Sequence, residues 1–155
     1  MIITLARQCG SGGTQVGRAL SEKYRLPLFD MRALSEAGKA TGLFERTPEF
    51  FAERPMNSLL SAISLAADKS GVRRGAEKIL AELLPPDDFI LIGRCGNVVY
   101  GDRPNCVRVF LCGEFAARVK VLRERYGISE ATAKARVTVR EIERKPGSSP
   151  LSTTL

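Results

Sequence analysis

The sequence contains no histidine and no tryptophan among its 155 residues, and aromatic residues make up only 6% of it. The absence of histidine excludes a histidine general base, a histidine proton relay and a histidine-ligated metal site. Four cysteines are present, but none follow a Cys-x-x-Cys spacing, so the sequence predicts no metal-ligating residues. We expect Cys9, Cys95, Cys106 and Cys112 to be reduced, as in a cytoplasmic protein.

Long apolar runs and a leader segment are also missing from the sequence. No stretch is long enough to span a membrane, and Met1 leads directly into a short apolar segment instead of a signal peptide. We therefore expect a cytoplasmic protein without membrane contact. With 155 residues, 44% of them apolar, the chain is long enough for one globular domain with a buried core.

Positive charge is in excess, because 24 lysines and arginines stand against 17 acidic residues, for a net charge of +7. This excess favours an anionic ligand such as a nucleotide or a nucleic acid, although a solvated basic surface would give the same numbers. A nucleic-acid-binding module is the weaker interpretation. The basic residues are spread over many predicted helices, few aromatic residues interleave them, and no helix-turn-helix or RNA-binding motif is present.

The segment around which the chain is organised lies at its beginning. Residues 2–6 predict an apolar strand, residues 7–14 a glycine-rich turn, and residues 15–20 the first turns of a helix. This arrangement is typical of phosphate binding, because glycines let backbone amides converge on an anion and the helix N-terminus adds positive charge. The turn lacks the lysine of a standard Walker A loop. A tight turn that binds no ligand is the alternative.

The rest of the chain predicts alternating strands and helices. Further strands are expected at 26–30, 89–92 and 107–111, and the all-apolar run at 89–92 is typical of a buried parallel strand. Helices are expected at 31–39, 57–69, 72–84, 114–126 and 129–143, with one helical turn at 97–100. Gly71 is expected to break a helix, and residues 43–55 to form a mobile loop or short helix. The order predicts a parallel α/β sheet with helices on both faces.

Helical spacing also predicts which side chains point inward. In the first helix the residues that share one face are Val16, Ala19, Leu20 and Tyr24. In the helix at 72–84 the core candidates are Ile79, Leu80 and Leu83, and in the helix at 114–126 they are Phe115, Val119 and Leu122. Ser129 is expected to cap the last helix.

Three separated blocks resemble the cytidylate kinase-like family over roughly Met1 to Lys145. The first block runs from Thr4 to Gly13 and on to Gly17. The second comprises residues 93–96, followed by 102–105 and 107–110. The third comprises residues 125–130 with the spaced pair Glu141 and Arg144, and all three blocks occur in the order of that family.

This resemblance implies a three-layer α/β/α P-loop kinase-like fold with a parallel sheet and a helical lid, formed by residues 1–145. It implies transfer of the ATP γ-phosphoryl to a nucleoside monophosphate such as CMP or dCMP, with Mg. The residues expected to bind the ATP phosphates are Arg7, Gly10, Ser11, Gly12, Gly13 and Thr14. The residues expected to bind the acceptor phosphate are Arg32 and Arg94. The lid arginines expected to act on the transferring phosphoryl are Arg144 first and Arg118 second.

The sequence departs from the family pattern at two places. Cys95 replaces the aspartate that follows the arginine of the second block in cytidylate kinases, which leaves the acceptor base open. After Arg144 the family continues with an aromatic-rich stretch and a final strand, whereas residues 146–155 form a Pro/Gly/Ser/Thr-rich tail that we expect to be disordered. We interpret this change as a truncation or frame change.

Alternatives therefore stay open for the whole chain and for single residues. A nucleotide- or phosphate-binding domain without turnover would follow if the lost strand is needed for activity. An unpaired sheet edge would favour a homo-oligomer. For each arginine, an ordinary surface position or an ion pair that fixes a strand end is the competing role.

Overall fold

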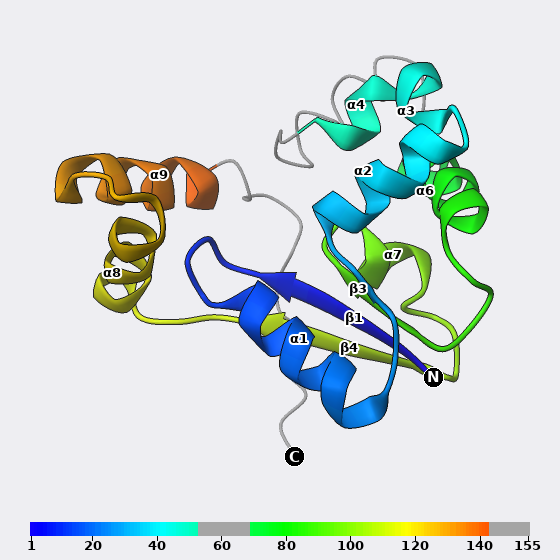
Figure 1. The fold of residues 1–155 in the computed structure, drawn as a ribbon, viewed down its shortest axis with the longest axis horizontal. Coiled ribbons are helices and arrows are strands. Elements are labelled where there is room, and N and C mark those ends of the chain that lie inside the picture. Colours follow the sequence, from blue (N-terminus) through cyan, green and yellow to red (C-terminus); the bar gives the residue numbers. More distant parts are fainter. Residues whose placement is uncertain (53–68, 143–155) are drawn as a thin grey trace.

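A computed structural model describes residues 1–52 and 69–142 of the chain (Figure 1). In these ranges four strands form one parallel sheet in the order β2-β3-β1-β4. The strands are β1 (Ile2–Arg7), β2 (Leu28–Phe29), β3 (Phe89–Ile92) and β4 (Cys106–Leu111). The helices are α1 (Gly13–Tyr24), α2 (Met31–Ala40), α3 (Leu43–Arg46), α4 (Pro48–Phe51), α6 (Lys69–Leu83), α7 (Gly96–Val99), α8 (Phe115–Tyr126) and α9 (Glu130–Ile142).

Both faces of the sheet are covered, which gives three layers. Alternate residues of β1 and β3 point to opposite faces, as a strand requires. On one face, residues such as Leu5 and Ile92 pack with Leu20 of α1. On the other face, a larger cluster joins the sheet to α2, α4, α6 and α7, and its fully buried members include Phe89 and Leu80. The parallel α/β sheet with helices on both faces is therefore confirmed.

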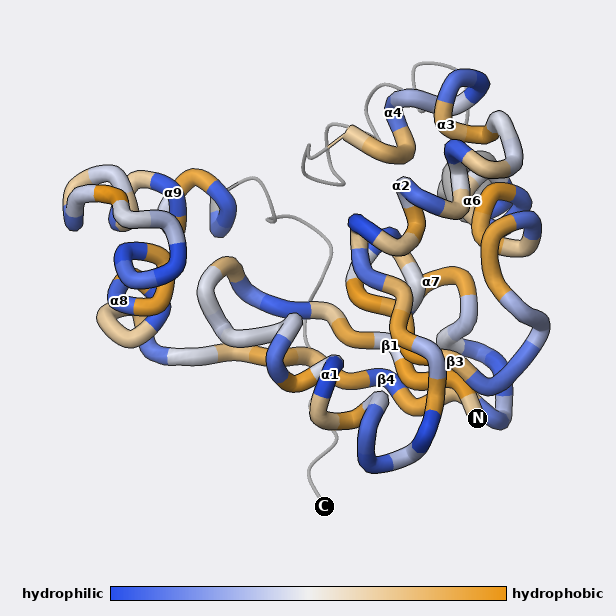
Figure 2. The backbone as a smooth tube through the Cα atoms, viewed as in Figure 1, coloured by the Kyte–Doolittle hydropathy of each residue, from blue (hydrophilic) through white to orange (hydrophobic). Residues whose placement is uncertain are grey.

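Helices α8 and α9 form a hairpin beside the sheet, opposite the group formed by α2, α3 and α4 (Figure 1). The hairpin has a small apolar cluster of its own, and apolar and polar segments alternate along it (Figure 2). Gly127 ends α8 in a left-handed conformation with φ 61°. The Ser129 hydroxyl accepts a hydrogen bond from the Thr132 amide at 3.1 Å, which confirms the predicted helix cap.

Several expected elements are shifted. Only Leu28–Phe29 of the expected strand at 26–30 pairs in the sheet, and Asp30 instead caps α2 by accepting hydrogen bonds from the amides of Arg32 and Ala33. The break expected at Gly71 is wrong, because this residue lies within α6. The loop or short helix expected at 43–55 contains two short helices, α3 and α4, in its described part, which agrees with the short-helix alternative. The helix expected at 57–69 and the tail at 146–155 lie outside the described residues, apart from Lys69 in α6.

The predicted inward faces were correct only in part. In α1, Ala19 and Tyr24 are exposed, whereas Gly13 and Gly17 are buried against the sheet. In α8, Val119 and Leu122 are buried as predicted, but Phe115 is exposed. Strand β4 carries exposed apolar side chains and pairs only with β1 among the described residues. In those residues no helix is long and apolar enough to cross a membrane.

Candidate phosphate-transfer site

The sheet topology brings the functional loops to one edge. Because all four strands are parallel, the segments after β1, β2, β3 and β4 leave the sheet at the same edge. In the sheet, β2 lies beyond β3 on one side of β1, and β4 lies on the other side of β1. The chain therefore leaves β1 toward one lateral edge of the sheet and leaves β3 toward the opposite edge, so the direction of the connections reverses between these two neighbouring strands. Ligands of open α/β sheets bind at this reversal point. The glycine-rich loop and the turn at Gly93 lie on either side of it.

The glycine-rich loop has the backbone geometry that an anion site needs. Gly10 and Gly12 have φ of 83° and 80°, a left-handed conformation that glycine adopts without steric cost. The Ser11 hydroxyl donates a hydrogen bond to the Gln8 carbonyl at 2.9 Å, which holds the turn closed. Helix α1 begins with neither a side-chain cap nor an acidic residue in its first turn. Its N-terminal amides and dipole therefore remain available to a phosphate.

Arg7 lies between this loop and the turn after β3. A methyl group added to Gly13 would lie 3.0 Å from Arg7 Cγ and Cδ, and one added to Gly93 would lie 2.4 Å from Arg7 Nη1. The side chain thus crosses from the start of α1 to the end of β3, and both glycines leave room for it. Arg7, which the resemblance predicts to bind the ATP phosphates, therefore lies at the reversal point of the sheet.

The turn after β3 is conformationally strained. Gly93, Arg94 and Cys95 have φ of 78°, 50° and 57°, so three consecutive residues are left-handed. For the two non-glycine residues this conformation costs about 1–3 kcal/mol each, and such strain clusters at functional sites. Burial raises the pKa of the Cys95 thiol to about 11, although the charge of Arg94 opposes the shift. Cys95 is therefore an uncharged thiol at neutral pH.

The two predicted acceptor-binding arginines are near one another in the fold but differ in surroundings. Arg94 donates hydrogen bonds to the Met31 sulfur and to the Ala52 carbonyl, each at 2.9 Å. Its guanidinium also lies 5.8 Å from the ring centre of Phe50. Arg32, next to Met31 in α2, is exposed and pairs with Glu36 at 3.6 Å. The structure therefore directs Arg94 toward α2 and α4, and leaves Arg32 on the surface.

The two predicted lid arginines have different outcomes. Arg144 lies outside the described residues. Arg118 is buried, with 4% of its surface exposed, and it contacts the glycine-rich loop through the Cys9 carbonyl. Its guanidinium is held by protein groups on three sides. In this conformation Arg118 connects segments of the protein and does not project into open space.

Gln8 has a role that its sequence position did not predict. The Gln8 side-chain oxygen accepts a hydrogen bond from the Gly113 backbone amide at 3.0 Å, and the Gln8 backbone amide donates a hydrogen bond to the Leu111 carbonyl at 2.8 Å. Gln8 thereby joins the glycine-rich loop to the connection between β4 and α8. A polar residue directly after a buried strand was the available signal, but its partner lies 105 residues further along the chain.

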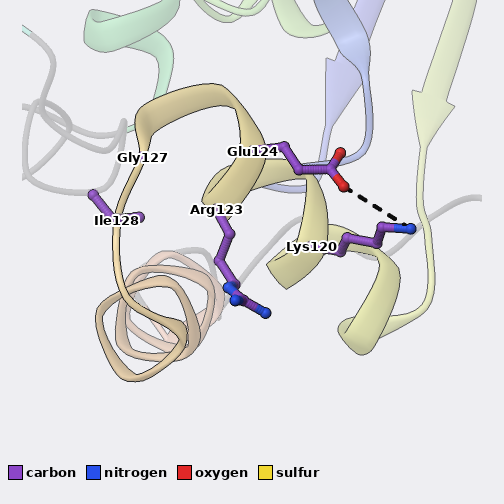
Figure 3. A pocket seen from close by; sticks show the side chains of 5 residues that line it. All are labelled: Lys120, Arg123, Glu124, Gly127 and Ile128. Carbon is purple, nitrogen blue, oxygen red and sulfur yellow. Dashed lines mark ion pairs between the residues drawn. The ribbon is translucent and has the colours of Figure 1, made fainter.

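A shallow pocket opens at the corner between α8 and α9 (Figure 3). It is lined by Lys120, Arg123, Glu124, Gly127 and Ile128, and Lys120 pairs at 3.9 Å with Glu124, one turn further along α8. None of the predicted site residues lines this pocket. It is therefore separate from the reversal point of the sheet.

The sheet order and the loop are those of a P-loop kinase-like fold, and comparisons with solved structures agree with this fold. The structure is similar to a gluconokinase from Sinorhizobium meliloti 1021, with a TM-score of 0.56, 14% identity and coverage of 98% of this chain and 77% of that one. It is also similar to a shikimate kinase from Bacteroides thetaiotaomicron, with a TM-score of 0.52, 18% identity and coverage of 94% and 79%. At these identities the likeness shows the fold alone.

The chain belongs to the cytidylate kinase-like family, whose model matches residues 2–147. An uncharacterized protein from Eubacterium ventriosum is similar in structure, with a TM-score of 0.62, 26% identity and coverage of 94% of this chain and 73% of that one. No sequence matches among curated proteins. The family and the kinase fold support a phosphotransferase of the nucleotide-kinase type.

Proposed function

We propose that this protein transfers the γ-phosphoryl group of ATP to a nucleoside monophosphate, with CMP and dCMP as the first candidates. The observation that carries the proposal is the position of Arg7, which crosses from the start of α1 to the Gly93 turn. The loop after β1 would bind the donor phosphates, and the turn after β3 would lie beside the acceptor phosphate. Arg7 would then place positive charge between the two, where negative charge develops during transfer.

The residues fit an ATP–Mg complex. The first turn of α1 contains no acidic residue, its N-cap makes no side-chain hydrogen bond, and Thr14 in that turn supplies a hydroxyl oxygen. No cluster of three potential metal ligands gathers in the described ranges 1–52 and 69–142. Mg would therefore be held mainly through phosphate oxygens and water, as this ion prefers, with Thr14 as the protein ligand. When bound, Mg neutralises phosphate charge.

The acceptor side depends on Arg94. Its contacts with Met31 and Ala52 hold the guanidinium between the sheet edge and the helices α2 and α4. We assign it the acceptor phosphate, with exposed Arg32 as a second contact at the start of α2. Cys95 supplies no charge to the acceptor, so the base preference must come from elsewhere in that region.

A coupled assay of ADP release tests the proposal with CMP, dCMP, UMP and AMP as acceptors. We expect turnover with at least one pyrimidine monophosphate. Arg94→Gln should reduce kcat/KM for the acceptor about 10–100-fold, the range expected for losing hydrogen bonds to a charged phosphate. Arg103→Gln is the matched control, because Arg103 is an exposed arginine that contacts Tyr100 and the Pro86 carbonyl.

Other outcomes separate the alternatives. A rise in melting temperature with Mg–ATP but no ADP release with any acceptor would indicate a nucleotide-binding domain without turnover. No rise with any nucleotide, together with a steeply salt-dependent affinity for RNA or DNA, would indicate a nucleic-acid-binding module instead.

A further inference from the structure

Arg118 is buried, with 4% of its surface exposed, and it is the only buried charged residue among those whose burial the structure describes. Its guanidinium donates three hydrogen bonds. Nε donates to the Gly113 carbonyl at 2.9 Å, Nη1 to the Cys9 carbonyl at 3.5 Å, and Nη2 to the Glu141 carboxylate. These acceptors belong to the β4–α8 connection, the glycine-rich loop and helix α9. One side chain therefore joins three segments that are distant in sequence.

The glycine-rich loop is also in direct van der Waals contact with the α8–α9 hairpin. The Cys9 side chain packs against the apolar cluster of that hairpin. A methyl group on Gly10 would lie only 2.6 Å from the Arg118 carbonyl oxygen, so the loop backbone passes against the first turn of α8. The loop cannot shift without changing the surroundings of Arg118.

Burial makes these contacts difficult to give up. A buried guanidinium that loses a partner keeps its charge in a poorly solvated position, so its hydrogen bonds are stronger constraints than those of an exposed pair. The same hairpin contains such an exposed pair, in which Arg123 and Glu130 lie 3.5 Å apart with about half of each side chain exposed. Exposed pairs of this kind constrain little.

We propose that Arg118 and Glu141 are positioning residues that couple helix α9 to the glycine-rich loop. Movement of the loop displaces the Cys9 carbonyl, the guanidinium follows, and the Glu141 end of α9 moves with it. Glu141 lies three residues before Arg144 in sequence, so the coupling reaches the end of α9 that precedes this arginine. The coupling itself does not depend on the proposed function. Only the idea that ATP phosphates are the anion whose binding moves the loop rests on that function.

Hydrogen exchange of the free protein tests this coupling. Glu141→Gln keeps the size of the side chain but leaves the guanidinium charge without its carboxylate. Arg118→Lys keeps the charge but lacks the fork that reaches three acceptors. In both variants we expect the peptide spanning residues 8–16 to exchange roughly tenfold faster, the effect of losing one charge-assisted hydrogen bond. Glu130→Gln, which removes the carboxylate of the exposed pair, should leave this peptide unchanged.

The peptide spanning β3 is the internal reference in every variant. Faster exchange in the loop with an unchanged β3 supports the coupling. The proposal is overturned if Glu141→Gln loosens α9 alone, or if all peptides, including β3, accelerate equally as in general destabilisation. Melting curves of the wild type with Mg–ATP form a separate arm: no shift there would contradict the proposed function, whereas the exchange comparison would still decide the coupling.

Discussion

At the scale of single residues, Gly10 shows most clearly why the loop needs its sequence. The residue has φ 83°, and an added methyl group would meet the Arg118 carbonyl oxygen at 2.6 Å. Gly10→Ala should therefore lower the free energy of unfolding by about 2–4 kcal/mol, because backbone strain and a backbone clash add. Gly42→Ala is the control, since Gly42 has φ 71° but the part of the chain that the structure describes places nothing within 4 Å of the added methyl.

Urea denaturation measures both variants. For Gly42→Ala only the conformational cost of about 1–2 kcal/mol is expected. Equal losses in the two variants would show that the close approach of the loop to α8 does not exist in solution. An additional loss of ATP affinity in Gly10→Ala alone would agree with a displaced loop.

Cys95 gives a prediction on pH dependence. Burial raises the pKa of its thiol to about 11 in the folded protein, above the ordinary value of 9.0. The thiol therefore contributes stability that is fully present below pH 9 and is lost as the pH rises toward 11. We expect wild type to lose up to about 2–3 kcal/mol more than Cys95→Ala over this interval. Parallel stability curves for the two proteins, measured by urea denaturation at each pH, would contradict a buried thiol at this position.

Single residues also show where sequence reasoning ends. The glycines of the loop and the turn at residues 93–96 could be identified, because their spacing reflects local backbone needs. The hydrogen-bond partners of Arg94 and Arg118 could not be identified from the sequence. Arg94 bonds to Met31 and Ala52, which lie 63 and 42 residues away in sequence, and only the folded chain brings them together. The burial of Arg118 likewise depends on Cys9 and Glu141.

At the scale of elements, the close packing of α2 on α4 depends on Gly38. A methyl group there would lie 2.4 Å from the Phe51 ring, which is itself buried. Gly38→Ala should lower the free energy of unfolding by about 1–2 kcal/mol, because overpacking outweighs the improved helix propensity. In α6, a methyl group on Gly75 meets nothing within 4 Å among the described residues, so Gly75→Ala should instead raise the free energy of unfolding by about 0.5–1 kcal/mol.

Thermal or urea unfolding measures both variants. The critical result is that the free energy of unfolding changes in opposite directions in Gly38→Ala and Gly75→Ala. A stabilising Gly38→Ala would mean that α4 does not lie against α2, and that the contacts of Arg94 with this region need revision. The position of α4 matters for the site, because Phe50 and Ala52 form part of the surroundings of Arg94.

Strands and helices with strong patterns were predictable, whereas their faces and breaks were less so. The apolar run at 89–92 gave β3 with its observed bounds. The inward face of α1 was misjudged, because Gly13 and Gly17 let the helix approach Arg7 and Ile92 closely and so turn Tyr24 outward. Gly71 did not break α6, since packing of Leu80 and Leu83 in the core outweighs a single weak helix former.

At the scale of the whole molecule, the strand order decides which loops lie side by side at the candidate site. The reversal between β1 and β3 brings the glycine-rich loop and the Gly93 turn together, and the α8–α9 hairpin rests against the same loop through Arg118. The alternation of elements allowed the layers to be predicted from sequence. The orientation of the hairpin was not predictable, because it depends on one buried guanidinium and on the Gln8 side chain.

The most direct test of the central claim is a titration of isotope-labelled protein with Mg–ATP, followed through backbone amide NMR signals. We expect the amides of residues 10–14 to shift together with those of Gly93 and Arg94, since Arg7 connects the two segments. The signals of the pocket residues Gly127 and Ile128 should change far less. Shifts at that pocket with unchanged signals from residues 10–14 would contradict a phosphate site at the start of α1.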